Sequence, residues 1–141
     1  MANAFTVDIL TPDKVVGKNI PAESLLIPTV RGQINVLADH THIVSKLETG
    51  TLSVFGGADD PDRHFSVTIG VCKLLKDKVI VLANTSEEVH EIDVERAKRA
   101  LGNAEDKLKS AETLSEDELV KYQRKVGRAR LRIQMAQEHK K

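Results

Sequence analysis

The apolar residues of this 141-residue chain change their spacing once, within the stretch Glu91–Ala97. Before it they alternate with polar residues in short runs, which is the pattern of half-buried strands. After it they recur at every third or fourth position, which is the pattern of one helix face. The change of period predicts a β domain over residues 1–86 and a helical arm over residues 87–141.

The first part contains short apolar runs, from Phe5–Ile9 to Val79–Ala83, that are separated by proline, glycine and aspartate turns. A spacing of about 8 to 12 residues is typical of an antiparallel sandwich and not of alternating strands and helices. Aromatic residues make up 3% of the chain, so the core must consist of Val, Ile, Leu and Ala. We therefore expect an all-β sandwich or flattened barrel of about eight to ten short antiparallel strands.

Two apolar stripes with steps of three and four follow the change of period: Val94, Ala97, Leu101, Ala104, Leu108 and Ala111, then Leu119, Tyr122, Val126, Ala129, Ile133 and Ala136. Between them, Ser115 and Glu118 have the spacing of a capping box, which starts a new helix. The arm is predicted to be an antiparallel α-helical hairpin. Gly102 and Gly127 each cost about 1 kcal/mol relative to Ala in a helix interior, so we expect a marginal, movable hairpin.

The net charge is zero, yet residues 121–141 hold eight Lys or Arg and one acid. Lys121, Lys125, Arg128 and Arg132 share one face of the second predicted helix, with Arg124 and Arg130 beside it. A solvated basic face is one interpretation, and an acidic protein partner is the other. Nucleic acid is not favoured because the chain lacks aromatic stacking platforms, and the stripes lack the Trp, Phe and Leu of a membrane-surface helix.

Other functional classes find little support in the sequence. The single cysteine, Cys72, has no predicted base beside it, and no phosphate-binding glycine loop is present, so we expect no enzyme and no catalytic residue. The segment Asp39–His42 lacks a second cluster of metal ligands, so we expect no metal site. With no apolar run of about 18 residues and no secretion signal at residues 1–4, any membrane contact should go through partners.

The polar pair Asp93 and Arg96 opens the first predicted helix. The simplest interpretation is a helix N-cap worth about 1 kcal/mol, together with a partly exposed ion pair worth less than about 1 kcal/mol. A functional role for the pair is the alternative.

Three stretches, in this order, resemble the ε subunits of F-type (bacterial-type) ATP synthases. They are Gly32–His40, Lys78–Thr85 and the motif Ile92-Asp93-x-x-Arg96-Ala97. The resemblance covers essentially the full chain. It implies a non-catalytic central-stalk subunit whose sandwich binds the γ subunit and the membrane c-ring, and so helps to couple proton flow to ATP synthesis.

The resemblance also implies interface residues and a location. The loop that would face the rotor contains Gln33, Asp39, His40 and His42. The arm would either fold on the sandwich or extend toward the catalytic α and β subunits and inhibit ATP hydrolysis. A basic face of Lys121, Arg124, Lys125 and Arg128 would then contact an acidic segment of the β subunit. The expected location is the cytoplasmic face of the bacterial cell membrane, as a peripheral part of the complex.

Some bacterial members of that family bind ATP as a regulatory ligand at the folded arm. The resemblance carries this role to Glu87, Ile92, Asp93, Arg96, Ala97, Arg128 and Arg132, while Asn103 replaces a further arginine of the family. Guanidinium groups suit phosphate oxygens, and a carboxylate can accept from an adenine amine or a ribose. No cofactor is otherwise required. A different class of function would be a free-standing sandwich module whose basic helical tail binds an acidic protein or RNA.

Overall fold

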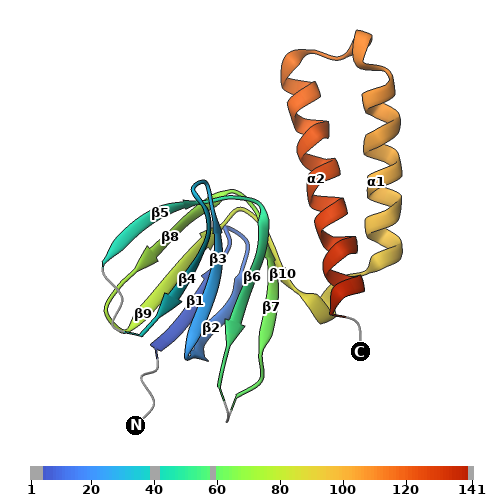
Figure 1. The fold of residues 1–141 in the computed structure, drawn as a ribbon. Coiled ribbons are helices and arrows are strands. Elements are labelled where there is room, and N and C mark those ends of the chain that lie inside the picture. The colour runs from blue at the N-terminus through green and yellow to red at the C-terminus, as the bar shows by residue number, and fades with distance from the viewer. Residues whose placement is uncertain (1–4, 39–41, 58–59, 140–141) are drawn as a thin grey trace. The chain divides into compact units, whose positions relative to one another are not determined.

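The computed structural model describes residues 5–38, 42–57 and 60–139, which divide into the compact units Met1–Glu88 and Val89–Lys141. The first unit is a sheet of ten strands (Figure 1). The strands are β1 (Phe5–Leu10), β2 (Val15–Ala22), β3 (Ser24–Thr29), β4 (Gly32–Leu37), β5 (Ile43–Leu47), β6 (Gly50–Phe55), β7 (Arg63–Val67), β8 (Gly70–Leu74), β9 (Lys78–Ala83) and β10 (Ser86–Glu88). β10 extends the sheet beyond the boundary expected at residue 86.

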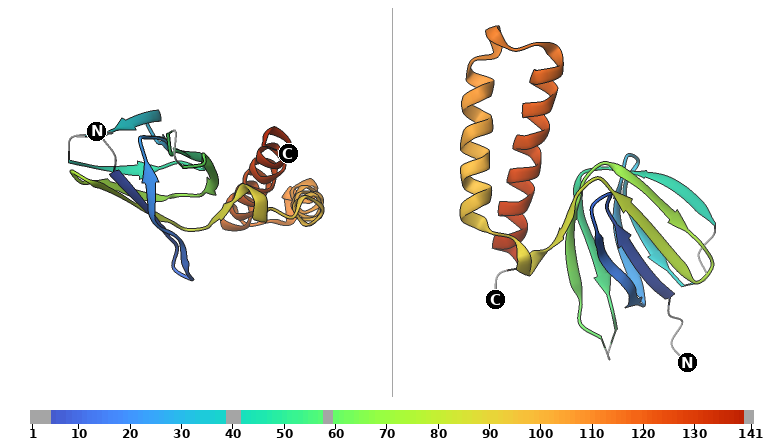
Figure 2. Two further views of the ribbon diagram at one scale, coloured as in Figure 1. Left: turned by 90° about the horizontal axis from the view of Figure 1, so that it is seen from below. Right: turned by 180° about the vertical axis from the view of Figure 1, so that it is seen from behind.

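The strands follow the order β10-β7-β6-β3-β5-β8-β9-β1-β2, and β4 pairs with β3 outside this path. The sheet curls so that its parts face one another across a core, which confirms the predicted sandwich or flattened barrel (Figure 2). One detail of the prediction is wrong. β1 and β9 pair in parallel, with Val7 opposite Val79 and Ile9 opposite Val81, whereas the other described pairs are antiparallel.

The core of the first unit consists mainly of Val, Ile, Leu and Ala, as the composition predicts. Phe5 and Phe65 are its two aromatic members. The strand pleat explains which residues enter it, because successive side chains point to opposite faces. In β9, for example, Val79, Val81 and Ala83 are buried, whereas Leu82 between them is exposed. Alternation of this kind fixes the register, since a slip of one residue would turn the buried set outward.

The second unit begins with a 3-10 helix at Val89–Glu91 and contains α1 (Val94–Lys109), a 3-10 turn at Ala111–Thr113 and α2 (Glu116–Glu138). The two long helices lie side by side as a hairpin (Figure 1). The predicted capping box is present: the Glu118 N–H donates to Ser115 Oγ at 3.1 Å, and the Ser115 N–H donates to the Glu118 carboxylate at 3.3 Å. The predicted hairpin is thereby confirmed, including the start of its second helix.

The apolar stripes of the hairpin differ from the prediction in two places. α1 ends at Lys109, so Ala111 falls in the 3-10 turn instead of continuing the stripe. Met135 is fully buried although it lies beside the predicted stripe of α2. Of the predicted stripe residues, the buried ones are Ala97, Ala104, Val126 and Ala129. Small residues thus occupy much of the contact between the helices.

Candidate anion-binding groove

A groove of about 700 Å³ runs along the hairpin between α1 and α2. Its apolar lining consists of three alanines, Ala100, Ala104 and Ala129. Alanine side chains are too short to fill the space between two helices, so the small-residue stripes leave a hollow. The polar lining adds four cations, one acid, one amide and one phenol: Lys107, Lys125, Arg128, Arg132, Asp106, Asn103 and Tyr122.

The charges around this groove are unbalanced. The carboxylate of Asp106 lies 3.8 Å from the Lys109 ammonium, in a pair that is exposed on both sides. In the described part of the chain, Lys107, Lys125 and Arg128 have no carboxylate partner. Like charges at neighbouring helical positions repel one another and destabilise the helix by a few tenths of a kcal/mol. An anion in the groove would reverse that cost, so the arrangement suits an anionic ligand.

Two lysines of α2 lie close to the ring of Tyr122. The ammonium groups of Lys121 and Lys125 lie 5.6 and 5.4 Å from the centre of its ring. Both distances are within the range of a cation–π contact, which holds a lysine near the face of an aromatic ring. Of the two lysines, Lys125 lines the groove and Lys121 does not.

The structure brings together two of the residues predicted to bind a nucleotide, Arg128 and Arg132, which line the groove opposite Asn103. Ile92, Asp93, Arg96 and Ala97 are not part of its lining, and Glu87 belongs to β10 of the other unit. Arg96 is exposed one helical turn before the groove residue Ala100, and Ala97 is fully buried.

Asp93 caps α1, as the simplest interpretation of the pair predicts. Its side chain accepts a hydrogen bond of 3.1 Å from the Arg96 N–H. Within the described residues, the Arg96 guanidinium makes no ion pair with this carboxylate. The cap therefore uses the backbone of Arg96 and leaves its side chain available to another group.

The predicted interface residues are found on exposed surfaces. Gln33 is exposed on β4, and His42 is exposed immediately before β5. Asp39 and His40 lie outside the described residues. On α2, Lys121, Arg124 and Lys125 are exposed and Arg128 is half-buried. Lys125 and Arg128 therefore belong both to the predicted basic face and to the groove.

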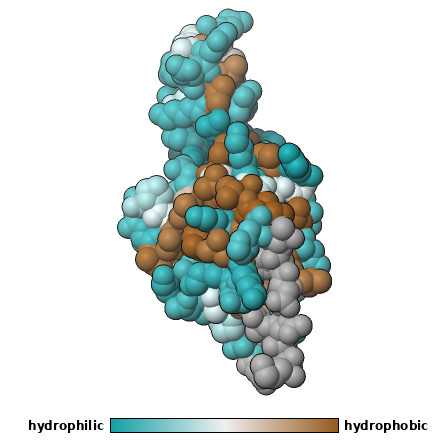
Figure 3. Space-filling model, turned by 90° about the vertical axis from the view of Figure 1, so that its left-hand side faces the viewer, coloured by the Kyte–Doolittle hydropathy of each residue, from teal (hydrophilic) through white to brown (hydrophobic). Residues whose placement is uncertain are grey.

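Sequence reasoning missed an apolar surface on the outer side of the sheet, which we call the outer apolar face. It comprises Val44 of β5, Val71 of β8 and Leu82 of β9, which are 66%, 37% and 45% exposed. Val71 pairs with Leu82 in register, and brown atoms gather on this side of the molecule in Figure 3. The sequence does contain a sign of this face, because the unbroken apolar run Val79–Ala83 is typical of a strand that is covered on both faces.

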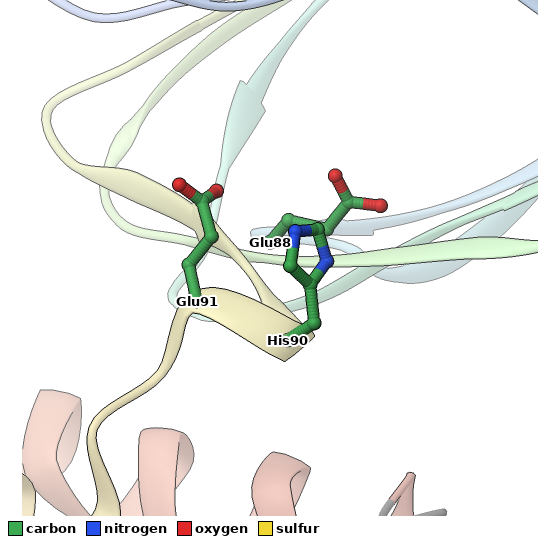
Figure 4. Close-up of side chains that lie close together, drawn as sticks. All are labelled: Glu88, His90 and Glu91. Atoms are coloured by element: carbon green, nitrogen blue, oxygen red, sulfur yellow. The ribbon is translucent and has the colours of Figure 1, made fainter.

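Two other groups could suggest chemistry. Burial raises the pKa of the Cys72 thiol, which keeps it protonated and disfavours a role as nucleophile. Ligand atoms of Glu88, His90 and Glu91 lie within 4.8 Å of one another at the end of β10 and in the following 3-10 helix (Figure 4). The Glu88 carboxylate already accepts two hydrogen bonds from Arg63, at 2.8 and 2.7 Å. A cation would have to compete with that guanidinium, so we assign no metal to this cluster.

Within the described ranges, no helix combines the length and the apolar character needed to cross a membrane.

Two family models match consecutive parts of the chain. The β-sandwich domain of the ATP synthase Delta/Epsilon chain matches residues 4–89, and its long alpha-helix domain matches residues 90–137. Proteins similar to this chain include the ATP synthase epsilon chains of Persephonella marina, with 35% identity over 94% of this chain and 96% of the relative, and of Staphylococcus aureus, with 32% identity over 96% and 98%. The chain therefore belongs to the delta/epsilon family of ATP synthase chains, among the epsilon chains.

Two solved structures share the fold of this chain. A chain of the Euglena gracilis mitochondrial ATP synthase matches with a TM-score of 0.75 and 20% identity, over 97% of this chain and 82% of that one. A chain from the central stalk and c-ring of the Tetrahymena thermophila mitochondrial ATP synthase matches with a TM-score of 0.54 and 11% identity, over 94% and 96%. At these identities the likeness concerns the fold.

Proposed function

We propose that the chain is a non-catalytic central-stalk subunit of an F-type ATP synthase, in which it helps to couple proton translocation to ATP synthesis. The observation that carries the proposal is the match of both family domains, in order, over nearly the whole chain. The matching Tetrahymena thermophila chain comes from a central stalk with its c-ring, which supports the same position here. The subunit would be a peripheral part of the complex at the cytoplasmic face of a bacterial membrane.

The sandwich would supply the rotor contacts. The outer apolar face exposes Val44, Val71 and Leu82, and apolar side chains of this kind are enriched at the centre of protein interfaces. We assign it to the γ subunit. The loop with Gln33 and His42, together with Asp39 and His40, is assigned to the c-ring.

The hairpin would regulate ATP hydrolysis. In this proposal, the basic face of α2 binds an acidic segment of the catalytic β subunit and inhibits hydrolysis when the arm extends. ATP bound between α1 and α2 would stabilise the closed hairpin and oppose that extension. The support is the excess of positive charge around the groove. ATP would shift the arm only to the extent that it binds the closed hairpin more tightly than the open one.

Co-purification with the γ subunit tests the assignment to the stalk. The tagged full chain should recover γ in a stoichiometric complex. Recovery of RNA or of an unrelated acidic protein without γ would instead support a free-standing interaction module and reject the rotor proposal.

Reconstituted ATP synthase tests the role of the arm. We expect faster ATP hydrolysis, with proton pumping retained, when the chain ends after Glu88. The full-length variant K121Q/R124Q should show the same direction of change, because it weakens the basic face while leaving the groove lining intact. Unchanged hydrolysis in both variants would show that the arm does not inhibit this enzyme.

Titration of ATP into the isolated subunit tests nucleotide binding. Arg128→Gln should weaken binding at least tenfold, because charge-assisted contacts to phosphate are among the stronger hydrogen bonds. Arg96→Ala tests the motif residue that lies outside the groove lining. Equal binding by the wild type and Arg96→Ala would remove Arg96 from the site.

A further inference from the structure

The groove carries more positive charge than the two predicted arginines supply. Lys107 of α1 and Lys125 of α2 also line it. Lys107 lies in the last turn of α1, and Lys125 precedes Arg128 and Arg132 on α2, which runs in the opposite direction. Both lysines therefore belong to the part of the groove nearer the interhelical loop. The arginines occupy the remainder of its length.

The cations of α2 form a row along this groove. With the usual rise of an α-helix, Lys125 and Arg128 are separated by about 4.5 Å along the axis, and Arg128 and Arg132 by about 6 Å. A ligand with one phosphate can meet only part of this row. A polyphosphate carries charge along its length and can contact all of it.

Lys107 distinguishes a ligand inside the groove from a partner on the surface of α2. Because Lys107 belongs to α1 and Lys125 to α2, a group that contacts both must bridge the two helices across the groove. An acidic protein segment that binds the exposed face of α2 does not require Lys107. Neither lysine has a carboxylate partner among the described residues, so both ammonium groups are available to a bound anion.

We infer that Lys107 and Lys125 form a phosphate subsite at the loop end of the groove. It binds the terminal phosphates of a nucleoside polyphosphate and selects di- and triphosphates over monophosphates. The inference rests on the proposed nucleotide-binding function of the hairpin and adds two residues that the sequence motif does not include. Arg128 and Arg132 contact the phosphates nearer the nucleoside.

Calorimetric titration of the full chain with ATP, ADP, AMP and inorganic tripolyphosphate tests the subsite. The variant K107Q/K125Q should weaken ATP and tripolyphosphate binding about tenfold, because two charge-assisted contacts are lost. ADP should be affected less, and AMP should bind as it does to the wild type. Gln has nearly the helix propensity of Lys, so circular dichroism should show unchanged helix content.

Lys98→Gln is the matched control. It removes the same charge from α1 at an exposed lysine, paired with Glu95, that does not line the groove. We expect wild-type affinity for all four ligands. Equal loss for ATP and AMP in K107Q/K125Q would indicate a general effect on the hairpin and overturn the subsite.

The two levels of the proposal can fail separately. If the wild type binds ATP, and K107Q/K125Q binds ATP and tripolyphosphate equally well, the subsite is wrong and the nucleotide-binding proposal stands. If the wild type binds tripolyphosphate but not ATP, and the double variant loses that binding, the phosphate subsite is supported while nucleotide recognition is rejected. If the wild type binds neither ligand, both are overturned.

Discussion

The guanidinium of Arg63, at the start of β7, donates two hydrogen bonds to the carboxylate of Glu88, the last residue of β10, at 2.8 and 2.7 Å. The same guanidinium lies 5.3 Å from the centre of the Phe65 ring, and Phe65 is the ladder partner of Glu88. β10 has only three residues. The ion pair therefore holds the short strand β10 against β7 at Glu88, the residue where the first unit ends.

Replacement of Glu88 by Gln should loosen this end of the sheet. The amide keeps the size of the carboxylate but loses the charge, and Arg63 is left without its bidentate acceptor. We expect the free energy of unfolding of the first unit to fall by about 2 kcal/mol. Hydrogen exchange should accelerate most at the β10 amides. Arg63→Lys is the companion variant and should show a smaller effect of the same sign, because Lys keeps the charge but not the fork geometry. Unchanged exchange in Glu88→Gln would show that the ladder alone holds β10.

Asp8 is a second buried acid held by cations. Its carboxylate accepts hydrogen bonds from Lys78 at 3.0 Å, from Lys18 at 3.2 Å and from the Asn19 N–H at 2.8 Å. Burial alone would raise the pKa of this carboxyl. The hydrogen bonds from Asn19, Lys78 and Lys18 outweigh burial, so the pKa of Asp8 is lower than its ordinary value of 3.8.

Acid should therefore weaken the sandwich. A carboxyl with a lower pKa in the folded state stabilises the protein above its unfolded pKa, and this contribution is lost as the pH falls from about 4 through the folded pKa. We expect chemical denaturation to show a falling free energy of unfolding in that range. Asp8→Asn should lower stability by about 2 kcal/mol at neutral pH and reduce the acid dependence. If the variant and the wild type lose stability in parallel below about pH 4, another carboxylate is responsible for the acid dependence.

Much of this fold could be predicted because its signals are local. Turn residues indicated where the strands end, and Ser115 with Glu118 indicated the start of α2. Pairing between distant segments could not be predicted in the same way. The parallel contact of β1 with β9 joins residues about 70 positions apart, and no nearby residue encodes it. Asn19, with a φ of 52°, is also set by tertiary context, because its N–H meets Asp8.

The candidate site was predicted in part for a similar reason. Arg128 and Arg132 were predicted from the family resemblance, and both line the groove in the structure. Lys107 was missed because its role depends on the way α1 packs against α2. The outer apolar face was missed because an unbroken apolar run such as Val79–Ala83 indicates that both faces of the strand are apolar, but not which residues point into the core and which point outward. Burial of Val81 and exposure of Leu82 become clear only once the sheet has curled.

Glycine to alanine changes in the hairpin should stabilise it. An added Cβ at Gly102 or Gly127 would meet no atom within 4 Å, so alanine fits at both positions. Each substitution should raise helix stability by about 1 kcal/mol, and the thermal transition of the helical signal should move upward. Gly70→Ala is the contrasting variant, because its Cβ would overlap the carbonyl oxygen of Leu82 and should destabilise the sheet. A hairpin transition unchanged by both helical substitutions would contradict the proposed cost of these glycines.

Leu82→Lys tests the outer apolar face. Leu82 is 45% exposed, and lysines already occupy neighbouring outward positions at Lys46 and Lys73, so the fold should tolerate the change. In the proposed interface, lysine at this position would lose the apolar area that Leu82 buries, and its ammonium group would have to be desolvated, which should weaken co-purification with γ at least tenfold. Val120→Lys on α2 provides the matched control, since Val120 is also 45% exposed. Recovery of γ should be normal with Val120→Lys. Normal recovery with Leu82→Lys, at an unchanged melting temperature, would move the γ contact to another surface of the sandwich.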